Sequence, residues 1–148
     1  MHTLKRNAIV PHSARQMYEL VNTIEDYPRF LPWCSGSHII KRTEEEVVAS
    51  LEVHWKGVSK NFTTQNRLFP DQRMEIQLVD GPLKRLQGTW EFIPLEEYAC
   101  KITLDLEFEF TGHLIDKLFQ PVFQHIANTL VEAFCKRAAE LYGGTEIC

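Results

Sequence analysis

The sequence predicts an α+β fold in which a curved antiparallel sheet of six to seven strands wraps around one long C-terminal helix. From His113 to Tyr142, apolar residues recur at steps of three and four, which is the period of an amphipathic helix. From about residue 39 to residue 110 the period changes to two, which is typical of half-buried strands. No helical segment separates these strands, which indicates a meander and not βαβ units. The 148 residues fit one domain, 1–148, ordered from about 3 to 143 with a tail at 144–148.

The N-terminal quarter is predicted to hold one strand followed by short helices. Thr3–Val10 alternates loosely and carries two basic residues, which suits a strand at the edge of the sheet. Pro11 ends this strand, and Ser13 is a good N-cap for a short amphipathic helix that reaches about Ile24. In Asp26–Cys34, two prolines prevent a long regular element, although the segment is rich in large apolar side chains.

Turn residues divide the middle of the chain into strands with apolar inward faces. The clearest strand, Tyr98–Phe110, alternates apolar and polar residues and places Asp105, Glu107 and Glu109 on the solvent-facing side. Carboxylates in such a row are most often only solvated, so we assign them no catalytic role. The strands before it are expected to begin at Ile39 and then to occupy Val47–Trp55, Phe62–Leu68, Met74–Leu78 and Leu86–Phe92.

The C-terminal helix sets the size of the domain. Pro121 interrupts its hydrogen-bond ladder, so we expect a kink or a short break just before that residue. From Pro121 to Tyr142 the helix spans about 33 Å, close to the width of six or seven strands. Gly143-Gly144 offers a left-handed C-terminal cap. A strand, short helices, about six strands and a long helix is the element order of the helix-grip fold.

Composition and charge argue against several functional classes. The net charge of −4 argues weakly against general nucleic-acid binding, and no apolar run approaches the roughly 20 residues that cross a bilayer. The first residues, Met1–Arg6, lack the apolar run of a secretory signal. The four cysteines have neither zinc nor redox spacing, so we interpret them as reduced thiols of a cytoplasmic protein.

The sequence carries no motif for a cofactor, a metal or a catalytic nucleophile. Neither GxGxxG nor GKS/T occurs, and no two histidines form an HxxxH or HExxH pair. His113 and His125 are twelve residues apart, over three helical turns, which is too far to share a metal. One alternative for Cys34, beside Trp33, is a catalytic nucleophile with a histidine distant in the sequence as its base. A thiol without a catalytic role is the simpler interpretation, so we predict a protein that is not an enzyme.

The inward positions of the strands and of the helix are rich in aromatic residues. A close-packed core is one explanation, and a gap between the curved sheet and the helix is the other. Gly88, flanked by large inward residues, marks the expected position of such a gap. An empty void of about 300 Å³ would cost on the order of 7 kcal/mol, comparable with the roughly 5–15 kcal/mol that stabilise a domain. The void is therefore small, or something apolar fills it.

The apolar segment Asp26–Cys34 is predicted to act as a lid over this gap. Because loops lie at the surface, its large side chains either fold inward over a cavity or enter a membrane surface, where Arg29 would meet lipid phosphate. The alternative is that Phe30 and Leu31 only plug the end of the core. The candidate ligand-binding residues are Tyr27, Phe30, Leu31, Pro32 and Trp33 in the lid, and Trp55, Phe62, Leu86, Trp90, Phe108, Phe119 and Phe123 along the tunnel.

Several segments, spread from about Leu4 to Tyr142, together resemble a known protein family. They are YPRFLPWC at Tyr27–Cys34, Phe62-Thr63-Thr64, DGPLKRLQGTWEF at Asp80–Phe92, DLEFEF at Asp105–Phe110 and VFxxxAxxLVEAFxxRA from Val122. The combination resembles the coenzyme Q-binding protein and ribosome-association toxin RatA family of the START-like (polyketide cyclase/lipid transport) superfamily.

The resemblance implies a helix-grip fold with a hydrophobic tunnel and no catalytic residues. In quinone-binding members it implies a bound isoprenoid quinone, ubiquinone, that supports respiratory electron transport, and hence peripheral contact with the inner membrane. The chain lacks the organelle-targeting extension of mitochondrial relatives, which predicts a bacterial member.

The resemblance also implies an alternative function, that of a toxin that binds the large ribosomal subunit and blocks subunit joining. Lys5, Arg6, Arg15 and Arg29 would then meet ribosomal RNA phosphates, although scattered surface charges without a function are the plainer explanation. A cyclase-type enzyme is a third alternative, which the absence of an acid/base pair facing the pocket disfavours.

Overall fold

One curved antiparallel sheet and one long helix form the two layers of the protein. The computed structural model describes residues 2–143, with the backbone alone for residues 115 and 116. Neighbouring strands of the sheet are all antiparallel, in the order β1-β7-β6-β5-β4-β3-β2. This confirms the predicted helix-grip architecture. The strands are β1 (His2–Val10), β2 (Cys34–Arg42), β3 (Glu46–Trp55), β4 (Val58–Phe69), β5 (Arg73–Asp80), β6 (Leu83–Glu96) and β7 (Ala99–Phe110).

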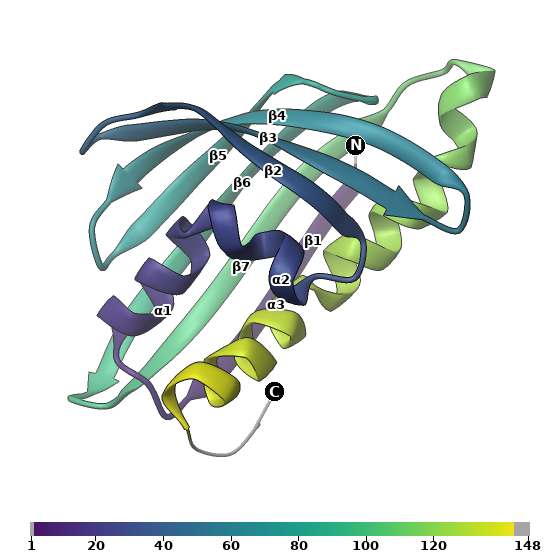
Figure 1. Ribbon diagram of the computed structural model, residues 1–148. Coiled ribbons are helices and arrows are strands. Elements are labelled where there is room, and N and C mark those ends of the chain that lie inside the picture. Colours follow the sequence, from purple (N-terminus) through teal and green to yellow (C-terminus); the bar gives the residue numbers. More distant parts are fainter. Residues whose placement is uncertain (1, 144–148) are drawn as a thin grey trace.

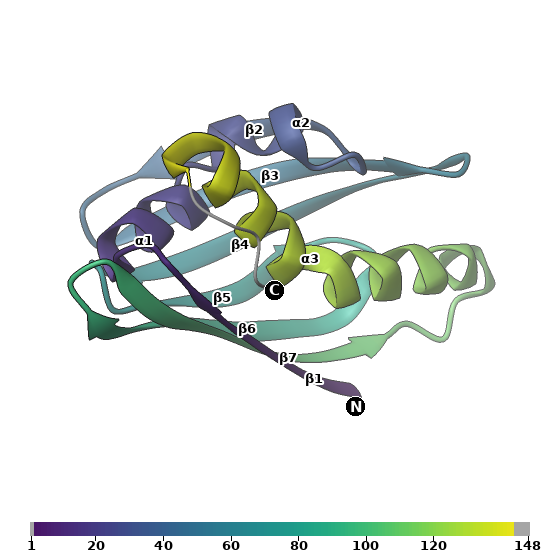
Figure 2. The ribbon, with the colours of Figure 1, turned by 90° about the horizontal axis from the view of Figure 1, so that it is seen from below.

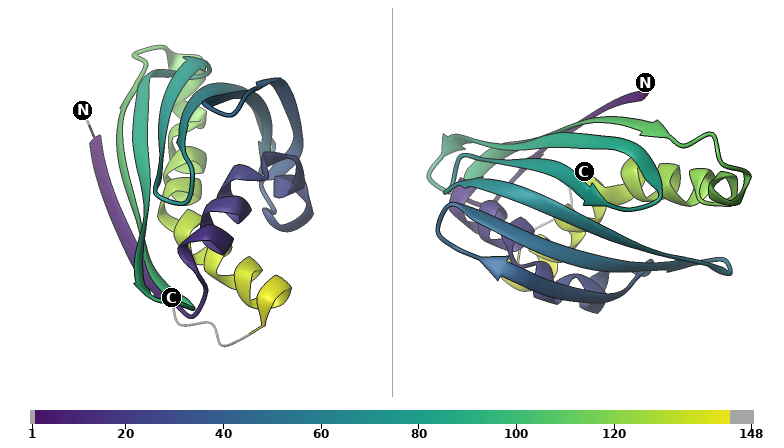
Figure 3. Two further views of the ribbon diagram at one scale, coloured as in Figure 1. Left: turned by 90° about the vertical axis from the view of Figure 1, so that its left-hand side faces the viewer. Right: turned by 90° about the horizontal axis from the view of Figure 1, so that it is seen from above.

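The helices all lie on the concave side of the sheet. The long helix α3 (Gln120–Tyr142) runs along this side, with β1 and β7 to one side of it and β2 and β3 to the other (Figure 3, left). The short helices α1 (Ala14–Asn22) and α2 (Tyr27–Phe30) are joined by a 3-10 turn at Ile24–Asp26 and lie beside α3 (Figures 1 and 2). β1 occupies the edge of the sheet next to β7, as its basic residues led us to expect.

Helix α1 begins where its capping residues predict. The Ser13 side chain accepts a hydrogen bond from the Gln16 backbone N–H at 3.1 Å, and the Gln16 side chain accepts one from the Ser13 N–H at 2.9 Å. This reciprocal pair satisfies two amide donors that the first helical turn leaves without partners. The helix then buries Met17, Leu20 and Val21 against the sheet.

The start of α3 differs from the continuous stripe that the sequence suggested. A 3-10 turn at Leu114–Leu118 comes first, and α3 begins at Gln120 with Pro121 in its first turn. The predicted break before Pro121 is therefore confirmed, at a position where proline disturbs no helical hydrogen bond. Leu118 and Leu141, which the predicted stripe included, are 70% and 49% exposed, so their assignment to the buried stripe was wrong. At the other end Gly143 has φ 80°, and its N–H donates to the Ala139 carbonyl at 2.9 Å.

Strand alternation places the core as predicted, with two local exceptions. On β7, Ile102 and Leu104 are buried, whereas Asp105 is exposed on the opposite face. Tyr98, which we expected to begin the inward face of this strand, is 69% exposed in the turn before it. At Gly88, where a gap was expected, a Cβ would lie 2.5 Å from the Cδ2 atom of Leu106, so this side chain covers the glycine, while the cross-strand partners Ile76 and Leu106 line the cavity described below. Gly88 thus allows β6 and β7 to pack closely.

The cysteines only partly agree with the expectation of four reduced thiols. Cys34 and Cys100 are free and buried. Cys135 is disulfide-bonded, which contradicts the expectation at that position, and Cys148 lies outside the described residues.

Candidate ligand-binding cavity

A mostly apolar cavity of about 130 Å³ lies between the inner face of the sheet and α3. Strands β3 to β7 supply one wall, α3 supplies the other, and Tyr27 and Trp33 close the end near α2. The residues of the α3 wall are spaced so that they share the one face of the helix that is turned toward the sheet. These residues are Phe123, Ile126, Ala127, Leu130 and Phe134.

Half of the candidate ligand-binding residues line this cavity. They come from the segment around α2, from the two strands β4 and β6 and from α3, which are far apart in the sequence. Their role in ligand binding stays a prediction. The lining members are Tyr27, Trp33, Phe62, Leu86, Trp90 and Phe123.

Three other candidates are core residues that do not face the cavity. Leu31 and Phe119 are only 1% and 0% exposed. Phe119 packs on Phe62 with ring centroids 5.2 Å apart, and Phe108 packs edge-on against Phe123 at 4.8 Å. These side chains hold cavity-lining rings in place from behind, so a ligand in the cavity would not touch them directly.

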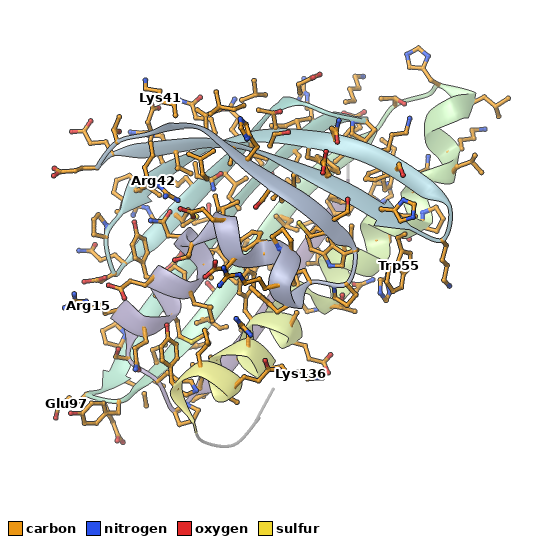
Figure 4. All side chains as sticks on the ribbon, in the orientation of Figure 1. Arg15, Lys41, Arg42, Trp55, Glu97 and Lys136 are labelled. Atoms are coloured by element: carbon orange, nitrogen blue, oxygen red, sulfur yellow. The ribbon has the colours of Figure 1, made fainter. Side chains whose placement is uncertain are left out.

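The remaining candidates line a surface groove of about 360 Å³ between the α2 segment and α3. Phe30 and Pro32 come from one side, and Trp55 stacks on His125 with ring centroids 5.0 Å apart. Trp55 and Lys136, both of which line this groove, are labelled in Figure 4. Trp33 lines the groove as well as the cavity, so its indole forms a wall between the two.

The apolar side chains of the predicted lid fold inward. Trp33 is 5% exposed and Tyr27 is buried, and both line the cavity, whereas Leu31 packs into the core. Leu31 thus packs as the core-plug alternative expected, whereas the role of the segment as a lid stays a prediction. Contact of this segment with a membrane stays a prediction.

Sequence reasoning missed the polar residues of the cavity, Thr64 and Asn66, which follow Phe62 on the inward face of β4. Asn66 is 5% exposed; its Nδ2 lies 3.6 Å from the Met74 sulfur, and its Oδ1 has no hydrogen-bond partner among the described residues. The signal was available, because an amide at the inward register of an alternating strand departs from the apolar pattern. The hydroxyl of Tyr27, by contrast, donates to the Val21 carbonyl, and burial raises its pKa.

The reactive side chains noted in the sequence have little catalytic character here. Burial raises the pKa of the Cys34 thiol to about 11, so it stays protonated and is a poor nucleophile at neutral pH. Asp105 and Glu107 are exposed on the convex face of the sheet, away from the cavity. Within residues 2–143, no three His, Cys, Asp or Glu side chains gather as a metal site would require. None of the described helices is long and apolar enough to cross a bilayer.

The sequence matches the family described as polyketide cyclase/dehydrase and lipid transport over residues 10–135. The chain belongs to this family. The match covers strands β2 to β7, the α2 segment and most of α3, and so includes every wall of the cavity.

Individual relatives agree with this assignment. The ribosome association toxin RatA of Escherichia coli (strain K12) is 47% identical over 142 residues, covering 96% of this chain and 90% of that protein. The mitochondrial coenzyme Q-binding protein COQ10 homolog B of Xenopus laevis is 29% identical over 143 residues, covering 94% of this chain and 59% of that protein. The crystal structure of the Zhui aromatase/cyclase from Streptomyces sp. R1128 has a TM-score of 0.81 at 15% identity and covers 97% of this chain and 99% of that chain, which shows a shared fold alone.

These matches confirm the family resemblance found in the sequence. The family description and the names of the relatives support the binding of a hydrophobic ligand, and the two curated relatives are named as a toxin and a binding protein. Quinone binding and ribosome association are both compatible with these names.

Proposed function

We propose that the protein is a non-enzymatic carrier that binds an isoprenoid quinone, ubiquinone, with its ring in the cavity between the sheet and α3. The main observation in support is the cavity itself, whose lining is almost entirely apolar and aromatic. Binding sites for small apolar molecules have this character, with few polar groups to orient the ligand. The coenzyme Q-binding protein among the relatives supports the same class of ligand.

The size of the cavity fits the ring and not the isoprenoid tail. At about 130 Å³ it is similar to the engineered apolar cavity of roughly 150 Å³ that holds benzene in another protein. Sites for larger ligands are usually about 300–1,000 Å³. The tail therefore needs a second space, and the groove of about 360 Å³ on the other side of Trp33 offers one. In this proposal the Trp33 indole moves when the prenylated ligand enters.

The energy of the empty cavity favours occupation. At about 24 cal/mol per Å³, a void of this volume costs on the order of 3 kcal/mol. A ligand that fills it recovers this energy without distorting the fold. The cost is also small enough for the empty protein to stay folded, as a carrier that takes up and releases its ligand must.

Organic extraction and mass spectrometry of the purified native protein test the proposal. We expect an isoprenoid quinone in a substantial molar ratio to protein, well above that in an unrelated protein purified from the same cells. An extract without quinone, together with failure of the protein to take up ubiquinone from vesicles, would overturn it.

Ribosome association is the second candidate function. The observation that favours it is the 47% identity to a protein named ribosome association toxin RatA. The basic residues of the N-terminal quarter offer limited support, because Arg15 pairs with Glu19 at 3.1 Å and Arg29 with Asp26 at 3.6 Å. Arg6 donates to the Asn128 side chain at 2.7 Å.

Sedimentation with separated ribosomal subunits at low and moderate salt tests the second candidate. We expect co-migration with the large subunit at low salt, weakened at moderate salt, since phosphate contacts depend on ionic strength. No co-migration at either salt concentration would exclude it. Because both assays use the same purified protein, they also reveal whether one chain has both activities.

A further inference from the structure

Asn66 stands out in the cavity because it is a buried amide in an otherwise apolar wall. Its neighbours in the register of the sheet are Val47 on β3 and Ile76 on β5. Val47 is fully buried, and Ile76 lines the cavity with Asn66. An apolar side chain would therefore suit this position on β4, and the amide needs another explanation.

The unpaired oxygen makes the amide costly for the empty protein. Asn66 is 95% buried, and its Oδ1 has no hydrogen-bond partner among the described side chains and backbone groups. A buried acceptor that loses its water without gaining a partner destabilises the fold. The two other orphaned atoms, on Asn22 and Arg137, belong to residues that do not line the cavity.

The orientation of the amide indicates which group would complement it. Its Nδ2 lies 3.6 Å from the sulfur of Met74, and Met74 is fully buried. A thioether sulfur accepts weakly and cannot donate, so it suits the N–H end of the amide and leaves the oxygen for the cavity. The missing partner is thus a hydrogen-bond donor.

We propose that Asn66 Oδ1 accepts a hydrogen bond from a hydroxyl group on the ring of the bound ligand. The cavity then favours a phenol or a quinol, the reduced form of a quinone, over a ring of equal size without a donor. This inference rests on the proposed function and adds the orientation of the ring, with its hydroxyl toward β4. The Tyr27 hydroxyl donates its proton to the Val21 carbonyl, so it has no donor left for an oxygen of the ligand.

Two rings of nearly equal size provide the test. p-Cresol differs from p-xylene by one hydroxyl in place of a methyl group, and calorimetry gives the Kd of each for the wild type and for Asn66→Val. We expect the preference for p-cresol over p-xylene to fall about tenfold in Asn66→Val, as loss of one buried hydrogen bond predicts. Taking the ratio cancels changes in cavity shape that affect both rings.

Asn22→Val is the matched control, because it also removes a side-chain amide whose buried oxygen has no hydrogen-bond partner among the described residues, but at a position outside the cavity. We expect this variant to keep the wild-type preference. The Tm of ligand-free Asn66→Val is expected to rise by a few degrees, since an unpaired polar group has been removed. If the Asn66 amide served only to stabilise the fold, Asn66→Val would instead lower the Tm.

Three outcomes would overturn the inference. An unchanged preference in Asn66→Val, or the same loss in Asn22→Val, would mean that Asn66 is not the anchor. 4-Methylanisole has the ring oxygen of p-cresol but no hydrogen-bond donor. If it binds as strongly as p-cresol and its binding depends on Asn66, the proposed direction of the hydrogen bond is wrong. All three leave the proposed function intact if quinone is extracted from the native protein.

Discussion

Filling the cavity from α3 should abolish ligand binding without harming the fold. Ala127 is 1% exposed and lines the cavity from the middle of the helix. Ala127→Leu places three more carbons in a void of about 130 Å³. At about 0.8 kcal/mol per buried carbon the transfer term is near 2.4 kcal/mol, offset by roughly 1 kcal/mol of lost rotamer freedom. We expect a net gain of about 1 kcal/mol and a Tm rise of about 2–4 °C.

The assay measures stability and binding on the same preparation. Thermal unfolding gives the Tm, and extraction of the native protein gives the quinone content, with p-xylene titration as a measure of ring binding. Ala139→Leu is the control, because Ala139 lies on the same helix, half-buried, outside both the cavity and the groove. It should leave quinone content and p-xylene affinity at wild-type values.

Two results would refute the reasoning. Full quinone content and p-xylene affinity in Ala127→Leu would mean that the ligand binds elsewhere. A Tm lowered by more than about 10 °C would mean that the leucine side chain clashes with packed atoms. The cavity beside Ala127 would then be too small to hold it.

Three further predictions concern stability. Gly88→Ala should lower the free energy of unfolding in urea by about 1–3 kcal/mol, because the added Cβ would lie 2.5 Å from Leu106 Cδ2 and 3.0 Å from the Asp105 carbonyl oxygen. Gly112→Ala is the control: no atom lies within 4 Å of its Cβ position, so stability should change by less than about 0.5 kcal/mol. Ser13→Ala should cost about 1 kcal/mol through loss of the α1 cap; an unchanged midpoint would contradict this. Burial lowers the pKa of His12 in the folded protein, so as the pH falls below 6.5 the unfolded chain takes up the proton before the folded one does. The free energy of unfolding should therefore be highest above pH 6.5 and decline below it, and His12→Gln should flatten that decline.

Local patterns predicted most of the fold because they report which face of an element is buried. On β7, the burial of Ile102 and Leu104 and the exposure of Asp105 follow directly from the period of two. The same reasoning failed at Leu118, where the apolar spacing is helical but α3 begins only after it, with Pro121 in its first turn. The 3-10 turn before it has three residues per turn, so it does not continue the face of α3.

The candidate site was harder to predict than the fold because a cavity is where inward side chains fail to meet. Phe119, the N-cap residue of α3, and Phe123, in its first turn, are both buried, yet Phe119 is in the packed core and Phe123 lines the void. That difference depends on the curvature of the sheet and the height of the helix above it, which periodicity does not contain. The closeness of Gly88 to Leu106 is of the same kind, since a glycine suits an open gap as well as a tight contact.

Trp33 connects the volume of the cavity to the way in which a ligand would bind. Its indole is 5% exposed and separates a cavity of about 130 Å³ from a groove of about 360 Å³, and neither space alone accommodates both a ring and an isoprenoid tail well. With Trp33 in this position the protein is closed, so the apparent affinity for a prenylated ring is reduced by the fraction of molecules in which the indole has moved. A small ring such as p-xylene needs no such movement. A smaller side chain in Trp33→Leu should therefore raise the affinity for the prenylated ligand relative to that for p-xylene, and an unchanged ratio would mean that the indole is no barrier.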